Sequence, residues 1–132
     1  GVDLERLQKI KGDNTPAIIV VLYGNRDYED ALLELRNTAK QLGFVPVAGG
    51  AFIGEHSYST EEFPTAAGRP DVSDIQIAAE FGKNIIKQLY QYTDIKKLPV
   101  LDVKGNFPYK ENKPRTPATP ITIDELCTQC QY

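Results

Sequence analysis

The sequence predicts an α/β fold built on a parallel sheet, and three observations indicate this class. Seven apolar residues run without a break from Ala17 to Tyr23, which is typical of a strand buried on both faces. An amphipathic pattern at helical spacing follows over residues 27–42, and a second strand-like stretch follows over residues 44–53. Two strands joined by such a helix form a right-handed crossover unit, in which the strands run parallel.

Length, charge and composition narrow the class of protein further. The chain has 132 residues, which suits a single domain. Its net charge of −3 argues against nucleic acid or an anionic membrane as the main partner, and no apolar run approaches the roughly 20 residues that span a bilayer. The first residues are charged and amphipathic rather than a signal peptide, and the chain contains no Met. We therefore expect a cytoplasmic protein whose sequence here begins inside a longer one.

The helices are predicted from periodicity and end signals. Apolar residues at helical spacing indicate a short helix over residues 2–10. Asp27 is placed to cap the next helix, and Gly43 is placed to end it. A second long helix is expected from Asp71 or Val72 to Tyr92.

The remaining segments give the predicted domain organisation. Pro46 cannot donate to a strand ladder, so the second strand is expected at a sheet edge. The loop over residues 54–71 is long enough to suggest a function or disorder. Residues 1–97 are then an α/β domain, and residues 98–132 are a proline-rich linker with a hairpin near Gly105-Asn106. Two strands are few for a stable sheet, so we expect a homodimer through the exposed sheet edge.

The loop after the first strand is the first candidate site. Gly24 allows close approach of a ligand to the backbone, Asn25 offers a donor and an acceptor, and Tyr23 or Tyr28 offers a ring for stacking. These residues suit a flat aromatic ligand. The alternative is an ordinary strand-to-helix turn with Tyr28 packed in the core. The full candidate set from this loop is Tyr23, Gly24, Asn25, Arg26, Asp27 and Tyr28.

The loop after the second strand is the second candidate site, because it follows the same edge of the sheet. His56 is the only histidine, and Tyr58 lies beside it in sequence. His56 is a candidate proton donor or hydrogen-bond donor to a ligand. The alternative is a structural hydrogen bond, because no cysteine or second histidine joins His56 as a metal-binding set. Arg69 precedes the second long helix, where it either holds an anion or is simply solvated.

Cys127 and Cys130 form a C-x-x-C pair near the end of the chain. Such a pair can be a redox dithiol, half of a zinc site or the start of an iron–sulfur motif. In the bacterial cluster spacing the third cysteine would be residue 133, and the printed sequence ends at Tyr132. Two thiolates alone are too few to hold a cluster.

Three stretches in order resemble one family. Residues 23–35, residues 43–58 and the Gly-Arg-Pro-Asp at 68–71 are similar to the flavodoxin-like domain of flavodoxin–ferredoxin fusions, sometimes called ferrodoxins. The tail over residues 119–130 resembles the approach to the first cluster of a bacterial ferredoxin. The resemblance covers roughly residues 15–130.

The resemblance implies a doubly wound, flavodoxin-like three-layer sheet of order 2-1-3-4-5, lacking its N-terminal strands. Residues 17–23 would be the fourth strand and 44–53 the fifth, so residues 23–28, His56 and Tyr58 would flank the ring of FMN. The longer protein would carry electrons between redox partner proteins, using FMN and 4Fe-4S clusters that Cys127 and Cys130 help to bind. The Gly/Ser/Thr-rich phosphate loop of that family is absent here, so weak or no FMN binding is expected.

Two other functions remain open on the sequence. The α/β unit is alternatively a non-redox interaction module, with Cys127 and Cys130 in a zinc-binding C-terminal tail. A third alternative is an oxidoreductase with its own substrate and His56 as proton donor.

Overall fold

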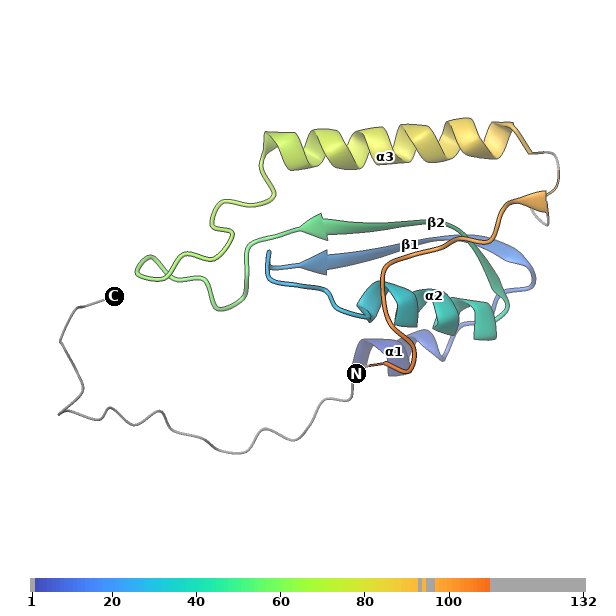
Figure 1. Ribbon diagram of the computed structural model, residues 1–132, viewed down its shortest axis with the longest axis horizontal. Coiled ribbons are helices and arrows are strands. Elements are labelled where there is room, and N and C mark those ends of the chain that lie inside the picture. The colour runs from blue at the N-terminus through green and yellow to red at the C-terminus, as the bar shows by residue number, and fades with distance from the viewer. Residues whose placement is uncertain (1, 93, 95–96, 110–132) are drawn as a thin grey trace.

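A computed structural model of the chain describes residues 2–92, 94 and 97–109. Its elements are α1 (Val2–Leu7), β1 (Thr15–Tyr23), α2 (Ala31–Gln41), β2 (Phe44–Ile53) and α3 (Val72–Tyr90). The two strands form a parallel sheet, with α2 over one face and α3 over the other (Figure 1). The predicted α/β class and the parallel pairing are confirmed. None of the helices in this part of the chain is long and apolar enough to cross a membrane.

The pairing of the two strands carries one irregularity, and it lies at the proline. Thr15 pairs with Phe44 and Tyr23 with Ile53, and the register shifts where Ala17 pairs with Pro46 and Ile18 pairs with Ala48. A residue that cannot donate to the ladder is tolerated at such a bulge or at an edge. Each strand has a single partner strand within the described residues, so both strands are edges there.

The core lies between the sheet and α2. Ile19 from β1 packs with Leu32 and Ala39 from α2, and all three are buried. Leu101 and Val103 pack against the same cluster. Residues 98–109 therefore cross α2 and contribute to the core, where the sequence suggests a linker without one. None of these twelve residues is assigned to a strand, so the hairpin expected at Gly105-Asn106 does not form there. Residues 110–132 of the predicted linker lie outside the described residues.

The start of α2 differs from the prediction. The helix begins at Ala31 with Asp30 as its N-cap residue, and Asp27 does not cap it. The Asp27 carboxylate instead accepts a hydrogen bond from the Glu29 backbone N–H at 3.1 Å, which closes a turn before the helix. Glu29 has a φ of 45°, a left-handed conformation that a right-handed helix does not accommodate. The predicted end is confirmed, because Gly43 follows the C-cap Leu42 with a φ of 87°.

The sheet face under α3 is covered only in part. Phe52 of β2 packs edge-to-face with Phe81 of α3, with ring centroids 5.4 Å apart. Ile18 and Leu22 on β1 are 52% and 76% exposed, and Ile75 on α3 is 58% exposed. A free strand edge flanked by exposed apolar side chains is a template for pairing with another strand. We therefore expect the chain to associate through the free edge of β1.

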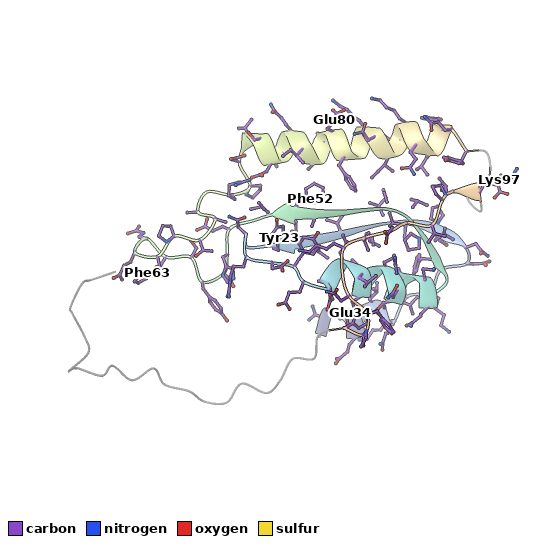
Figure 2. The ribbon with its side chains drawn as sticks, viewed as in Figure 1. Tyr23, Glu34, Phe52, Phe63, Glu80 and Lys97 are labelled. Atoms are coloured by element: carbon purple, nitrogen blue, oxygen red, sulfur yellow. The ribbon has the colours of Figure 1, made fainter. Side chains whose placement is uncertain are left out.

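Replacing Leu22 by lysine is expected to shift the chain from dimer to monomer, because a charged side chain on an edge strand opposes edge-to-edge pairing. The free energy of unfolding at low concentration should change little, since Leu22 is 76% exposed. Size-exclusion chromatography with light scattering measures the change. Phe63→Lys is the matched control, because Phe63 is 69% exposed at the far end of the loop between β2 and α3 (Figure 2). A wild-type chain that elutes as a monomer would contradict the expectation.

Candidate functional site at the carboxyl ends of the strands

The loops after β1 and β2 lie against each other, as the sequence predicts for the ends of neighbouring parallel strands. The Gly54 backbone N–H donates to the Tyr23 carbonyl at 3.0 Å, which extends the pairing beyond the strands. Beyond that bond, His56 lies directly against Gly24. A Cβ atom on Gly24 would lie 2.7 Å from the His56 Cβ, closer than Cβ atoms approach in proteins. The absence of a side chain at Gly24 therefore allows His56 to pack directly against the backbone.

These two loops line an open cavity of about 580 Å³. Its lining residues are Gly24, Arg26, Asp27, Glu29 and His56. Four of the five come from the predicted candidate set. Glu29 was not predicted, and its position results from the turn that precedes α2. The cavity is polar and combines one arginine with two carboxylates.

The predicted aromatic residues are not among those that line the cavity. Tyr23 and Tyr28 pack edge-to-face with their ring centroids 5.3 Å apart, and Tyr28 contacts the core beneath α2. Tyr58 is 75% exposed, and its ring centroid lies 5.3 Å from that of His56. Asn25 is exposed with a φ of 59°, so its role in the structure is to form the turn. Figure 2 shows Tyr23 at the carboxyl end of β1.

The His56 ring is oriented by the backbone of its own loop. Its Nδ1 accepts a hydrogen bond from the Tyr58 N–H at 3.1 Å. A neutral imidazole that accepts at Nδ1 carries its proton on Nε2. His56 can therefore donate one hydrogen bond from Nε2 while its orientation is fixed through Nδ1.

The loop that carries His56 is held closed by hydrogen bonds within it. His56 N–H donates to the Thr65 carbonyl at 3.1 Å, and Glu55 N–H donates to the Arg69 carbonyl at 2.9 Å. The Gly68 N–H also donates to the Glu55 carboxylate at 3.3 Å. The long loop over residues 54–71 is thus a closed loop that positions His56 at the sheet edge.

The segment after α3 supplies a cation that sequence reasoning missed. The Lys104 ammonium lies 3.0 Å from the Asp27 carboxylate and 4.9 Å from the centroid of the Tyr28 ring. The hydrogen bond from Lys104 lowers the pKa of Asp27, and the same contact raises the pKa of Lys104. Asn106 anchors the segment, because its N–H donates to the buried Asp30 carboxylate at 2.7 Å. The only local signal in this segment was the turn at Gly105-Asn106.

The structure places Arg69 in an ion pair within the chain. Its Nε and Nη2 atoms donate to the two carboxylate oxygens of Asp74, and its Nε lies 3.5 Å from the Asp71 carboxylate. Asp71 and Asp74 also form a capping box at the start of α3, which confirms the predicted helix start. Arg69 is thus committed to two carboxylates rather than held available for an external anion.

The same contacts lower the pKa of Asp74 to about 2, mainly through the hydrogen bond from Arg69. A depressed carboxylate pKa in the folded state stabilises the protein above the unfolded pKa, near 4, and this stabilisation is lost as the pH falls toward 2. We expect the melting temperature to fall over that window. Asp74→Asn should melt lower at pH 7 and show a smaller fall below pH 4, as followed by circular dichroism. An equal acid dependence in both proteins would contradict the assignment.

No group of three or more histidine, cysteine, aspartate or glutamate side chains that suits a metal ion occurs within residues 2–92, 94 and 97–109. The predicted metal ligands Cys127 and Cys130 lie outside these residues.

Comparison of the chain with protein-family models, with curated proteins and with solved structures finds no match in any of the three.

Proposed function

We propose that this α/β unit is the C-terminal half of a flavodoxin-like domain in an electron-transfer protein, and that the cavity beside Gly24 and His56 contacts the flavin ring of FMN. One observation carries the proposal: the loops after two parallel strands converge on one cavity at their carboxyl ends. Ligands of open α/β sheets bind outside the carboxyl ends of the strands. The cavity of about 580 Å³ is within the size range of small-molecule sites.

The residues of the cavity suit the ring of a flavin. Bound FMN would supply the transfer of one or two electrons. His56 would donate from Nε2 to a heteroatom at the edge of the ring, because its Nδ1 is already used by Tyr58. The carboxylates of Asp27 and Glu29 line the cavity together with the Arg26 guanidinium, and Lys104 pairs with Asp27 at 3.0 Å, so positive and negative charges both lie beside the proposed ring site.

The described residues do not fit the phosphate of FMN. Helix N-termini are the usual phosphate sites of α/β folds, but both long helices begin with carboxylates. Asp30 and Glu34 lie at the start of α2, and Asp71 and Asp74 cap α3. Among the residues that the structure describes, Arg26 is the one cation that lines the cavity, and it is accompanied by two carboxylates. We therefore propose that strands outside the printed sequence supply the phosphate site, and that this chain supplies one side of the ring.

The residues of this chain do not by themselves fit an iron–sulfur cluster. Cys127 and Cys130 are its only cysteines, and such clusters are held by four thiolates. The proposed ferredoxin module, with its 4Fe-4S clusters and its redox partner proteins, therefore belongs to a longer protein in the cytoplasm.

A comparison of two flavins tests the proposal on the chain as it stands. Fluorescence quenching of FMN and of riboflavin by increasing protein should give dissociation constants near 1 mM, equivalent to only about −4 kcal/mol. The two values should agree within about twofold, since the described residues offer no phosphate site. A micromolar FMN complex, or FMN binding at least tenfold tighter than riboflavin, would contradict this assignment of the phosphate. If the protein quenched the fluorescence of neither flavin, the proposed binding site for the flavin ring would be contradicted.

A further inference from the structure

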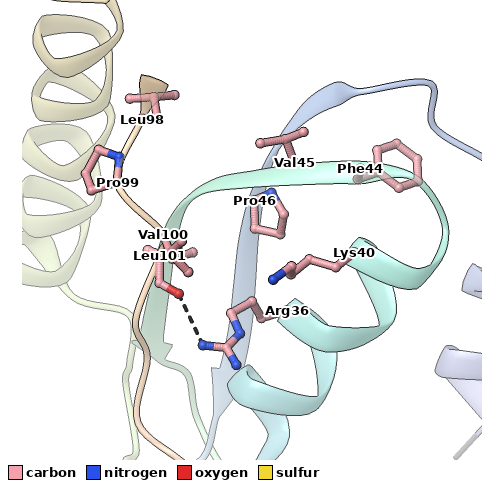
Figure 3. Close-up of a pocket in the computed structure, with 9 residues that line it drawn as sticks. All are labelled: Arg36, Lys40, Phe44, Val45, Pro46, Leu98, Pro99, Val100 and Leu101. Atoms are coloured by element: carbon pink, nitrogen blue, oxygen red, sulfur yellow. Dashed lines mark hydrogen bonds between the residues drawn. The ribbon is translucent and has the colours of Figure 1, made fainter. Parts of the chain in front are cut away.

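A second cavity, of about 260 Å³, lies at the opposite end of the sheet from the loops described above. It is bounded by α2, by the first residues of β2 and by the segment that follows α3 (Figure 3). Its walls are mainly apolar, and the side chains that form them include Phe44, Val45, Pro46, Pro99 and Leu101. Two cationic side chains, Arg36 and Lys40, reach it from α2.

The two cations have different roles. Arg36 donates from Nη1 to the Leu101 carbonyl at 3.1 Å, and from Nε and Nη2 to the Asn37 side chain at 3.1 and 2.9 Å. Three of the five N–H groups of its guanidinium therefore anchor it to the protein. Arg36 fixes the wall formed by residues 98–101 against α2. These hydrogen bonds give the cavity a defined shape.

Lys40 is the second cation of the cavity. Its side chain extends into the cavity toward Arg36 and the segment 98–101 (Figure 3). Within the part of the chain that the structure describes, its ammonium has no hydrogen-bond or ion-pair partner. An ammonium beside an apolar wall favours a ligand that carries one negative charge on an apolar body.

We propose that this cavity binds a small monocarboxylic acid with an aromatic or branched apolar body. The Lys40 ammonium would bind the carboxylate, and Phe44 with the proline-rich wall would cover the apolar part. The site is independent of the proposed flavin site, which lies at the other end of the strands.

Titration of the 15N-labelled chain with benzoate at pH 7 tests the proposal. We expect saturable chemical-shift changes at the amides of residues 44, 45, 98, 100 and 101, with a dissociation constant of about 1 mM. Lys40→Gln should weaken binding at least tenfold, whereas Lys40→Arg should retain it. Lys83→Gln is the matched control, because Lys83 is an exposed lysine on α3, 3.6 Å from Glu80. Benzamide, the neutral analogue of benzoate, should bind at least tenfold more weakly than benzoate.

Three results would overturn the proposal. Benzoate that gives no saturable change at these amides would show that the cavity does not bind the acid. Equal affinity for benzoate and benzamide would show that the charge is not recognised. Equal weakening by Lys40→Gln and Lys83→Gln would show that only net charge matters. Lys40 is exposed, so the variant is expected to fold, and its circular dichroism spectrum should match that of the wild type.

Discussion

Replacing Gly43 by alanine is expected to lower the free energy of unfolding by roughly 2–4 kcal/mol. Gly43 has a φ of 87°, a conformation that is costly for any residue with a Cβ. An added Cβ would also collide with the Gly12 carbonyl, whose carbon would lie 3.1 Å away. That contact joins the turn before β1 to the turn before β2, where Gly12 N–H donates to the Leu42 carbonyl at 2.8 Å. Urea denaturation followed by circular dichroism measures the loss.

Gly68→Ala separates the two causes. Gly68 also has a positive φ, 71°, but nothing lies within 4 Å of the position of an added Cβ. Replacing Gly68 by alanine should therefore lower the free energy of unfolding only by the cost of holding alanine at a positive φ, about 1 kcal/mol. If the two variants lost equal stability, the close contact between Gly12 and Gly43 would not be present in solution.

Replacing Gly24 by alanine is expected to remove the proposed flavin-ring site. The added Cβ would overlap His56, so the imidazole must leave its position at the end of β2. We expect flavin affinity to fall at least tenfold, and the free energy of unfolding to fall by about 1–3 kcal/mol because the junction of the loops is overpacked. Fluorescence quenching with FMN measures the affinity, and urea denaturation measures the stability.

Gly54→Ala is the control for this substitution. Gly54 lies at the same junction, yet an added Cβ there would meet nothing within 4 Å. This variant should bind flavin as the wild type does. A Gly24→Ala chain that kept wild-type affinity, or a Gly54→Ala chain that lost as much, would show that the contact between Gly24 and His56 does not shape the site.

The parts of the fold that sequence predicted well are those with local causes. The unbroken apolar run at residues 17–23 forms the predicted strand, and Ile19 packs in the core. The expectation that this strand is buried on both faces was wrong, because Ile18, Val20 and Leu22 on its other face are exposed. The start of α3 was predicted from Asp71 and Asp74, whose hydrogen bonds join residues only three positions apart. Gly43 ends α2 because a positive φ there needs glycine.

The parts that sequence missed depend on contacts between distant residues. Lys104 reaches Asp27 across 77 positions, and Asn106 reaches Asp30 across 76. No local pattern in a proline-rich segment indicates such partners. Arg69 was read as either solvated or anion-binding, although its partner Asp74 lies only five residues away. Its side-chain direction depends on the course of the preceding loop, which the sequence pattern does not specify.

The sequence predicted that the two loops of the candidate site lie together, but it did not predict the side-chain contacts between them. The two loops meet because parallel strands end at the same sheet edge, and this topology follows from the crossover unit. Gly24 was expected to admit a ligand, whereas in the structure the space beside it holds His56. The tyrosines were expected to stack on a ligand, whereas Tyr23 and Tyr28 pack on each other. Side-chain packing at the junction decides these details.

The most direct test of the proposed flavin site is an amide chemical-shift map of the 15N-labelled chain titrated with FMN at millimolar concentration. The proposal predicts saturable chemical-shift changes confined to the amides of residues 23–29 and 54–59. Riboflavin, which is less soluble than FMN, should shift the same amides when it is added up to its solubility. Changes centred on other residues, or none at either loop, would contradict a flavin-ring site at the carboxyl ends of β1 and β2.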